Sequence, residues 1–181
     1  MELSPLYTIE NQATRISIEP YHMNSNILLN MLDITKKKIE KKCNKNGYIY
    51  EVLEITNYSN GYMPAENLNG NAIIDIDYKA KIYIPIVNTC IITTVKIIKS
   101  EIICIVGKII IFIPEDNIDT NIWDIENKYT NILSNTKLKI NDFVKVKIIN
   151  KRINNNEEQI IAIGQLCDFP TNEEIQNFYY N

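Results

Sequence analysis

Apolar and polar residues alternate through residues 72–85 of this 181-residue chain. A period of two is typical of a long β-strand that buries one face and exposes the other. Pro85 ends the pattern, because proline cannot donate to a sheet ladder. The expected buried face carries Ile74, Ile76, Tyr78, Ala80, Ile82 and Ile84, and the expected exposed face carries Asp75, Asp77, Lys79, Lys81 and Tyr83.

The residues before this strand predict a strand, a helix and a second strand. Residues 6–19 alternate loosely up to Pro20, and residues 48–56 are rich in β-forming side chains. Between them, apolar residues with helical spacing predict a helix that Asn24 or Ser25 could cap, with Gly47 permitting the turn that follows. The stripe comprises Ile27, Leu28, Met31, Leu32, Thr35 and Ile39, and the last turns carry Lys36, Lys37, Lys38, Lys41 and Lys42.

Two interpretations of these lysines are open. Cations near the carboxyl end of a helix complement its dipole, which is a stabilising surface role. The alternative is a binding patch. In either case, one helix covering one face of a small sheet predicts an α+β layer.

Residues 57–70 are rich in Asn, Gly and Pro, so we expect an irregular loop there. The loop nevertheless carries Tyr58, Tyr62, Met63 and Leu68. Apolar side chains in such a connection either fold back onto the core or dock on a partner. The sequence leaves both interpretations open.

After residue 86 the pattern changes to short isoleucine-rich strands. Five strands without a helix long enough for a crossover predict a small closed barrel of the OB-fold type. Closure also removes the aggregation hazard of the run from Ile109 to Ile113. The segment 114–142 is too long for an ordinary connection and is expected to contain a short helix or to cover one mouth of the barrel. The predicted strands are 89–98, 101–106, 108–113, 143–152 and 159–166.

Composition and charge narrow the functional classes. A net charge of −3 and a pI near 5.3 exclude a surface that is basic throughout, so any contact with nucleic acid is local. Ile and Asn make up about a third of the chain, which indicates an A/T-rich genome of the kind found in many large DNA viruses, some protists and some low-GC bacteria. The four cysteines are scattered and the amino terminus has no signal-peptide pattern, so we expect a reduced, intracellular protein outside the membrane.

We find no constellation of catalytic residues in the sequence. His22 is the only histidine and lies at an expected strand-to-helix corner, so we interpret it as structural. The five glycines form no phosphate-binding motif, and the cysteines form no zinc-ligand cluster. We therefore expect no enzyme activity, no metal and no cofactor.

The strongest binding signal is the strand 143–152. Phe143, Lys145 and Lys147 share one face, opposite a face of apolar residues. OB-folds use an aromatic ring to stack a base and ammonium groups to neutralise phosphates. Lys99, Lys108 and Arg152 are expected to extend the charge. The alternative is an ordinary solvent-facing strand whose lysines prevent edge pairing.

The order of these elements resembles that of the stalk subunit of multisubunit DNA-directed RNA polymerases. That family includes the seventh subunit of eukaryotic polymerase II, its archaeal counterpart, and relatives in polymerases I and III and in large DNA viruses. The resembling segments are NGYIYEVL (46–53), IDYKAKIYIP (76–85), KINDFVKVKI (139–148) and IAIG (161–164). They occur in the family's order and together span most of the chain.

The resemblance implies three parts: a truncated RNP-like tip domain over residues 1–85, an S1-type OB-fold over 86–170, and a carboxyl-terminal tail over 171–181. It also implies that Gly61, Tyr62, Met63 and Pro64 contact the large subunits of the polymerase core. A helical fourth-subunit partner is expected near residues 84–87. The barrel would face nascent single-stranded RNA. The protein would reside in the virion and host cytoplasm if viral, or in the nucleus if cellular.

The chain departs from many S1-type domains around its second and third barrel strands. Isoleucines and Pro114-Glu115-Asp116 stand where those domains carry aromatic residues and a histidine. Stacking capacity is thereby reduced, so we expect RNA binding dominated by lysine and steeply dependent on salt. The alternative functions are a free-standing S1-type RNA-binding factor in translation or RNA decay, and an enzyme of unknown type.

Overall fold

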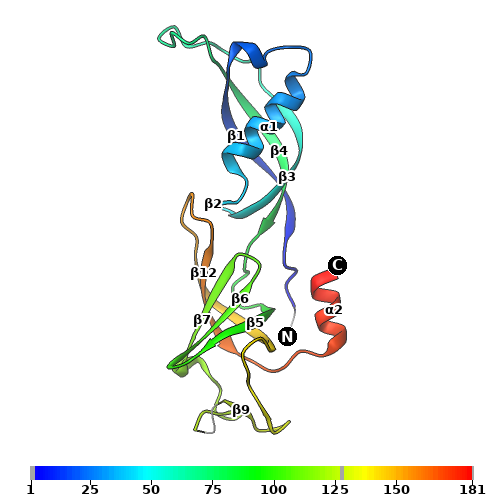
Figure 1. The fold of residues 1–181 in the computed structure, drawn as a ribbon, viewed down its shortest axis with the longest axis vertical. Coiled ribbons are helices and arrows are strands. Elements are labelled where there is room, and N and C mark those ends of the chain that lie inside the picture. Colours follow the sequence, from blue (N-terminus) through cyan, green and yellow to red (C-terminus); the bar gives the residue numbers. More distant parts are fainter. Residues whose placement is uncertain (1–2, 127–128, 181) are drawn as a thin grey trace.

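The computed structural model describes residues 3–126 and 129–180. The molecule is elongated, with a sheet covered by a helix at one end and a closed barrel at the other (Figure 1). Each half has its own cluster of buried apolar side chains. Within the described residues, no helix is long and apolar enough to cross a membrane.

The amino-terminal half is a four-stranded antiparallel sheet in the order β1-β4-β3-β2. Helix α1 contacts strands β1 and β3. The elements are β1 (Thr8–Ile18), a 3-10 turn η1 (Pro20–His22), α1 (Ile27–Ile39), β2 (Lys42–Asn44), β3 (Gly47–Tyr58) and β4 (Ala72–Tyr83). The prediction omitted β2 and ended β3 two residues early.

Strand β4 confirms the predicted alternation. Ala72 and every second residue up to Ile82 are buried, because that face packs under α1, where Met31 and Thr35 are also buried. The other face is polar and carries exposed ion pairs from Arg15 to Asp75 and from Lys79 to Glu54, both at 2.7 Å. Exposed pairs of this kind contribute little to stability.

The ends of α1 differ from the prediction. The cap residue is Asn26, whose side chain makes no capping hydrogen bond, while the Asn24 side chain accepts a hydrogen bond from the Asn26 N–H at 2.9 Å. The helix ends at Ile39, and Lys41 then adopts a left-handed backbone with φ of 62°. Lys42 consequently belongs to β2 instead of the helix.

The carboxyl-terminal half contains the predicted five-stranded closed barrel, in the order β11-β12-β7-β6-β5. Strands β12 and β7 run parallel, and the other neighbours are antiparallel. This arrangement is consistent with an OB-fold. The strands are β5 (Cys90–Ile98), β6 (Glu101–Val106), β7 (Ile109–Pro114), β11 (Phe143–Arg152) and β12 (Ile160–Leu166).

The long connection between β7 and β11 packs against one end of the barrel. It forms a 3-10 turn η2 (Glu115–Asn117) and a small sheet of β8 (Trp123–Asp124), β9 (Thr130–Asn131) and β10 (Thr136–Lys137). Trp123 is fully buried in the barrel core, and its indole Nε1 donates a hydrogen bond to the carbonyl of Cys167 at 2.7 Å. The connection therefore covers one mouth of the barrel, which was one of the two expectations for residues 114–142.

The two halves meet through backbone and core contacts. The Cys43 N–H of β2 donates to the Glu157 carbonyl at 2.7 Å, and the Asn156 N–H donates to the Cys43 carbonyl at 2.8 Å. Cys43 and Tyr48, although they come from the first sheet, are buried in the barrel's cluster. The amino-terminal segment also reaches the barrel, where Leu3 bridges to Cys90.

Residues expected to form a tail instead form a helix, α2 (Asn172–Tyr180). Thr171 and Glu174 make a capping box: the Thr171 N–H donates to Glu174 Oε2 at 2.7 Å, and the Glu174 N–H donates to Thr171 Oγ1 at 3.3 Å. Phe178 is buried against the barrel. The helix therefore lies against the barrel (Figure 1).

Candidate docking loop and nucleic-acid surface

The loop 59–70 projects from the end of the molecule farthest from the barrel, at the upper left of Figure 1. The Tyr62 backbone pairs with Ile73, through N–H to carbonyl contacts of 3.1 and 2.8 Å in the two directions. Its side chain is nevertheless 53% exposed, Met63 is 62% exposed and Leu68 is 99% exposed. These three side chains do not fold back onto the core, which removes one of the two sequence interpretations.

Gly61 and Pro64 hold the shape of this loop. A Cβ at Gly61 would lie 3.0 Å from Ile74, so the backbone approaches β4 closely. Pro64 is half-buried, and its carbonyl accepts a hydrogen bond from the Asn67 N–H at 3.0 Å. The four predicted contact residues thus divide into two that shape the loop and two that expose apolar side chains.

Sequence reasoning missed further apolar residues at the same end. Tyr21 is 68% exposed, Leu28 is 52% exposed and Leu29 is 63% exposed. These residues lie in η1 and the first turn of α1, which share the end of the molecule with the loop (Figure 1). Leu28 was assigned to the buried stripe, and that assignment is wrong. Ile27, in the same turn, does pack against the cluster of the first sheet, so the turn is covered only in part, and helical spacing does not show where the cover ends.

The expected barrel face forms on β11. Val144, Val146 and Ile148 are fully buried, so Phe143, Lys145 and Lys147 point outward on one strand, as predicted. Phe143 is 38% exposed. Its ring meets that of Tyr179 edge-on, with centroids 5.8 Å apart. Part of this face is therefore covered by α2.

Lys145 is paired with a residue of α2. Its Nζ donates to both carboxylate oxygens of Glu174 at 3.0 Å. The Thr171 backbone N–H, followed by Lys145, lowers the pKa of Glu174 below its ordinary value. Because both partners are partly buried, this ion pair is less screened by solvent than the exposed pairs on the first sheet.

The other predicted cations are dispersed. Lys99 lies in the hairpin between β5 and β6, and Lys108 in the turn between β6 and β7, so they occupy opposite ends of β6. A six-residue strand spans about 20 Å. Arg152 is at the end of β11 nearer Lys108, with its Nε donating to Asn154 Oδ1 at 3.3 Å. The structure thus groups only the three residues of β11.

No group of three or more His, Cys, Asp or Glu side chains is arranged to hold a metal ion in residues 3–126 and 129–180. The ring of His22 lies against that of Tyr21, with centroids 3.7 Å apart and ring planes tilted by 37°, at the strand-to-helix corner predicted from the sequence. The expectation that the chain has no cofactor remains a prediction.

A junction hollow of about 510 Å³ lies between the first sheet and the barrel. Ile86 and Val87, in the segment that connects the halves, are 42% and 38% exposed. Exposed apolar residues in a segment that connects two halves of a molecule provide contact area for another chain. The residues that line the hollow are Lys41, Tyr48, Tyr50, Glu51, Lys108 and Glu158.

No model of a known protein family matches the sequence. The chain is similar to a protein of Acanthamoeba polyphaga mimivirus named "Putative DNA-directed RNA polymerase subunit L376". The two are 32% identical over 182 aligned residues, which cover 98% of this chain and 90% of the relative. The similarity thus includes both the sheet with its projecting loop and the barrel. The chain therefore belongs to the family of this viral DNA-directed RNA polymerase subunit.

Proposed function

We propose that the chain is the non-catalytic stalk subunit of a DNA-directed RNA polymerase encoded by a large DNA virus. The observation that carries the proposal is the exposed apolar loop 59–70 at the end of the molecule opposite an OB-type barrel. The named relative, which aligns over both parts, supports a role in a polymerase. The protein would act in the virion and the host cytoplasm.

Docking on the large core subunits is assigned to the loop and its neighbours. Tyr62, Met63 and Leu68 expose apolar side chains, and Tyr21 and Leu29 add to the same end. A group of exposed apolar residues is typical of an interaction site, because burying it on a partner removes apolar area from water. The sheet covered by α1, together with its projecting loop, supports the proposal that residues 1–85 form an RNP-like domain.

The barrel is assigned to nascent single-stranded RNA. Lys147 on β11 and Lys99 at the end of the barrel remote from the sheet offer ammonium groups for phosphates. Few aromatic rings are available for stacking, so phosphate contacts dominate and affinity falls steeply as salt rises. The barrel would guide the transcript without reading its sequence.

A fourth-subunit-like partner is assigned to the junction hollow. Ile86 and Val87, in the segment that connects the halves, expose apolar side chains for such a partner. Tyr48, Tyr50 and Lys108 add rings and charge to its wall. A helix placed there would contact both halves and hold their relative orientation.

Co-purification tests the docking assignment. A tagged chain expressed during infection should recover the large polymerase subunits, and the double variant Tyr62→Asp, Met63→Asp should recover at least about tenfold less, because two charges would be buried in an apolar contact. Leu133→Asp is the matched control, since Leu133 is 84% exposed but lies in the connection at the opposite end of the molecule. Undiminished recovery by the double variant would refute the assignment of the loop.

The alternative, a free-standing S1-type RNA-binding factor, predicts a different result. The wild-type chain would then recover no polymerase subunit and would bind RNA as a monomer.

A further inference from the structure

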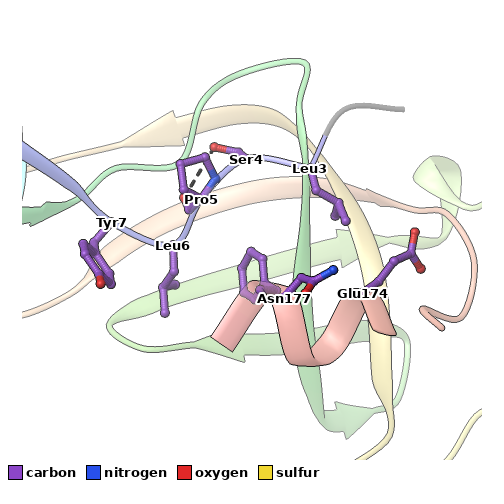
Figure 2. A pocket seen from close by; sticks show the side chains of 8 residues that line it. Leu3, Ser4, Pro5, Leu6, Tyr7, Glu174 and Asn177 are labelled. Atoms are coloured by element: carbon purple, nitrogen blue, oxygen red, sulfur yellow. Dashed lines mark hydrogen bonds between the residues drawn. The ribbon is translucent and has the colours of Figure 1, made fainter. Parts of the chain in front are cut away.

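Helix α2 lies on the face of the barrel that carries the binding signal. It contacts Phe143 and Lys145 through two different side chains, Tyr179 and Glu174. A cavity of about 300 Å³ lies between the helix and the amino-terminal segment, and Glu174 lines this cavity as well (Figure 2). The helix thus lies between that segment and β11.

The contact with Lys145 has the chemistry of a phosphate contact. Two anionic oxygens of Glu174 accept from one ammonium group at 3.0 Å. A nucleic-acid phosphate also presents two anionic oxygens, and lysine neutralises it in the same way. Glu174 and a phosphate therefore compete for Lys145.

The contact with Phe143 has the chemistry of a base contact. The ring of Tyr179 meets that of Phe143 at an angle of 61°, and an unstacked base would need the same aromatic surface. A wide hollow remains open around these rings. It is lined by Thr94 and Phe143 from the barrel and by Asn172, Ile175, Gln176 and Tyr179 from the helix.

We propose that α2 is an intramolecular mimic of single-stranded RNA, with a carboxylate in place of a phosphate and a tyrosine ring in place of a base, and that RNA binding to β11 displaces it. This inference rests on the RNA-binding part of the proposed function. Phe178 is the apolar anchor that returns the helix to the barrel, because it is buried in the barrel's cluster.

Helix α2 is held on the barrel weakly enough for RNA to compete with it. Partly exposed ion pairs contribute only modestly to stability, and cavities flank the helix on two sides. A cover held this weakly lowers the apparent affinity for RNA by the fraction of time that it is closed. Transcript at high local concentration could then open it.

The test measures binding of a labelled single-stranded oligouridine RNA to the full chain by fluorescence polarisation. Glu174→Gln removes the charge from Lys145 while preserving the capping box, since Gln also serves at that position. Glu173→Gln is the matched control, because it removes an equal charge from the same turn of α2 but has an exposed side chain. We expect Glu174→Gln to bind about 2–5-fold more tightly than Glu173→Gln.

Hydrogen exchange provides a second measurement. On addition of the RNA, the amides of α2 should lose protection in the wild-type chain, while those of the barrel core should not. Equal affinity of the two Gln variants, or unchanged protection of α2 at saturating RNA, overturns the mimic but leaves RNA binding intact. Absence of RNA binding by every variant overturns both the mimic and the RNA part of the proposed function, and co-purification tests docking independently.

Discussion

Gly164 provides the sharpest test of how the barrel is closed. It lies on β12, the strand that joins the antiparallel part of the barrel to β7 by a parallel pairing. A Cβ at this position would lie 2.3 Å from Val146 Cγ1 and 2.9 Å from Ile111 Cγ2, and both of those residues are fully buried. Gly164→Ala therefore forces neighbouring strands apart at the closure.

The expected cost follows from overpacking. Inserting a methylene into a well-packed core costs about 1–3 kcal/mol, and two contacts below 3.0 Å argue for the upper value, about 3 kcal/mol. With a urea dependence of about 1–3 kcal/mol per molar, the midpoint of unfolding should fall by roughly 1–3 M. A barrel opened at this seam would also expose the isoleucine-rich β7 as an edge, so aggregation on refolding should increase.

Trp123 makes the assay specific to the barrel. It is the only tryptophan in the chain and is fully buried in the barrel's cluster, so its fluorescence reports unfolding of that half. The control is Gly70→Ala in the loop of the first sheet, where φ is +67° and the nearest side-chain atom is 3.6 Å from the added Cβ. That variant should strain its loop without moving the tryptophan transition. A midpoint for Gly164→Ala within about 0.2 M of wild type would refute the reasoning.

Two further predictions concern ionisable groups. Because the pKa of Glu174 is lowered in the folded chain, its stabilisation of α2 is fully present above the unfolded value near pH 4.5 and is lost as the pH falls through the folded value. Wild type and Glu174→Gln should therefore differ most in α2 hydrogen exchange at about pH 6, and the difference should shrink as the pH is lowered below about 4.5. A difference that stays constant as the pH falls would contradict this. Burial raises the pKa of both Cys43 and Cys104 to about 11, so iodoacetamide should leave them unmodified in the native chain near pH 7.5 and alkylate them after denaturation, as mass spectrometry of peptides would reveal.

The sequence alone determined most of the strands. The alternation in β4 and the five strands of the barrel were predicted to within one or two residues of their observed ends. Period-two patterning reports which side of a strand is buried, and this property is local. The apolar loop 59–70 was also predicted from the sequence, because polar turn residues and large apolar residues occur together there.

Only the tertiary structure decided which side chains are covered by other elements of the chain. Leu28 has the spacing of a core residue but is exposed, although Ile27 in the same turn packs against the buried cluster of the first sheet. Helix α2 is nine residues long, too short for a clear periodic signal, and Phe178 stabilises it by packing on the barrel. The pairing of Lys145 with Glu174 joins residues 29 positions apart, and its existence depends on the chain's path, which local pattern does not encode.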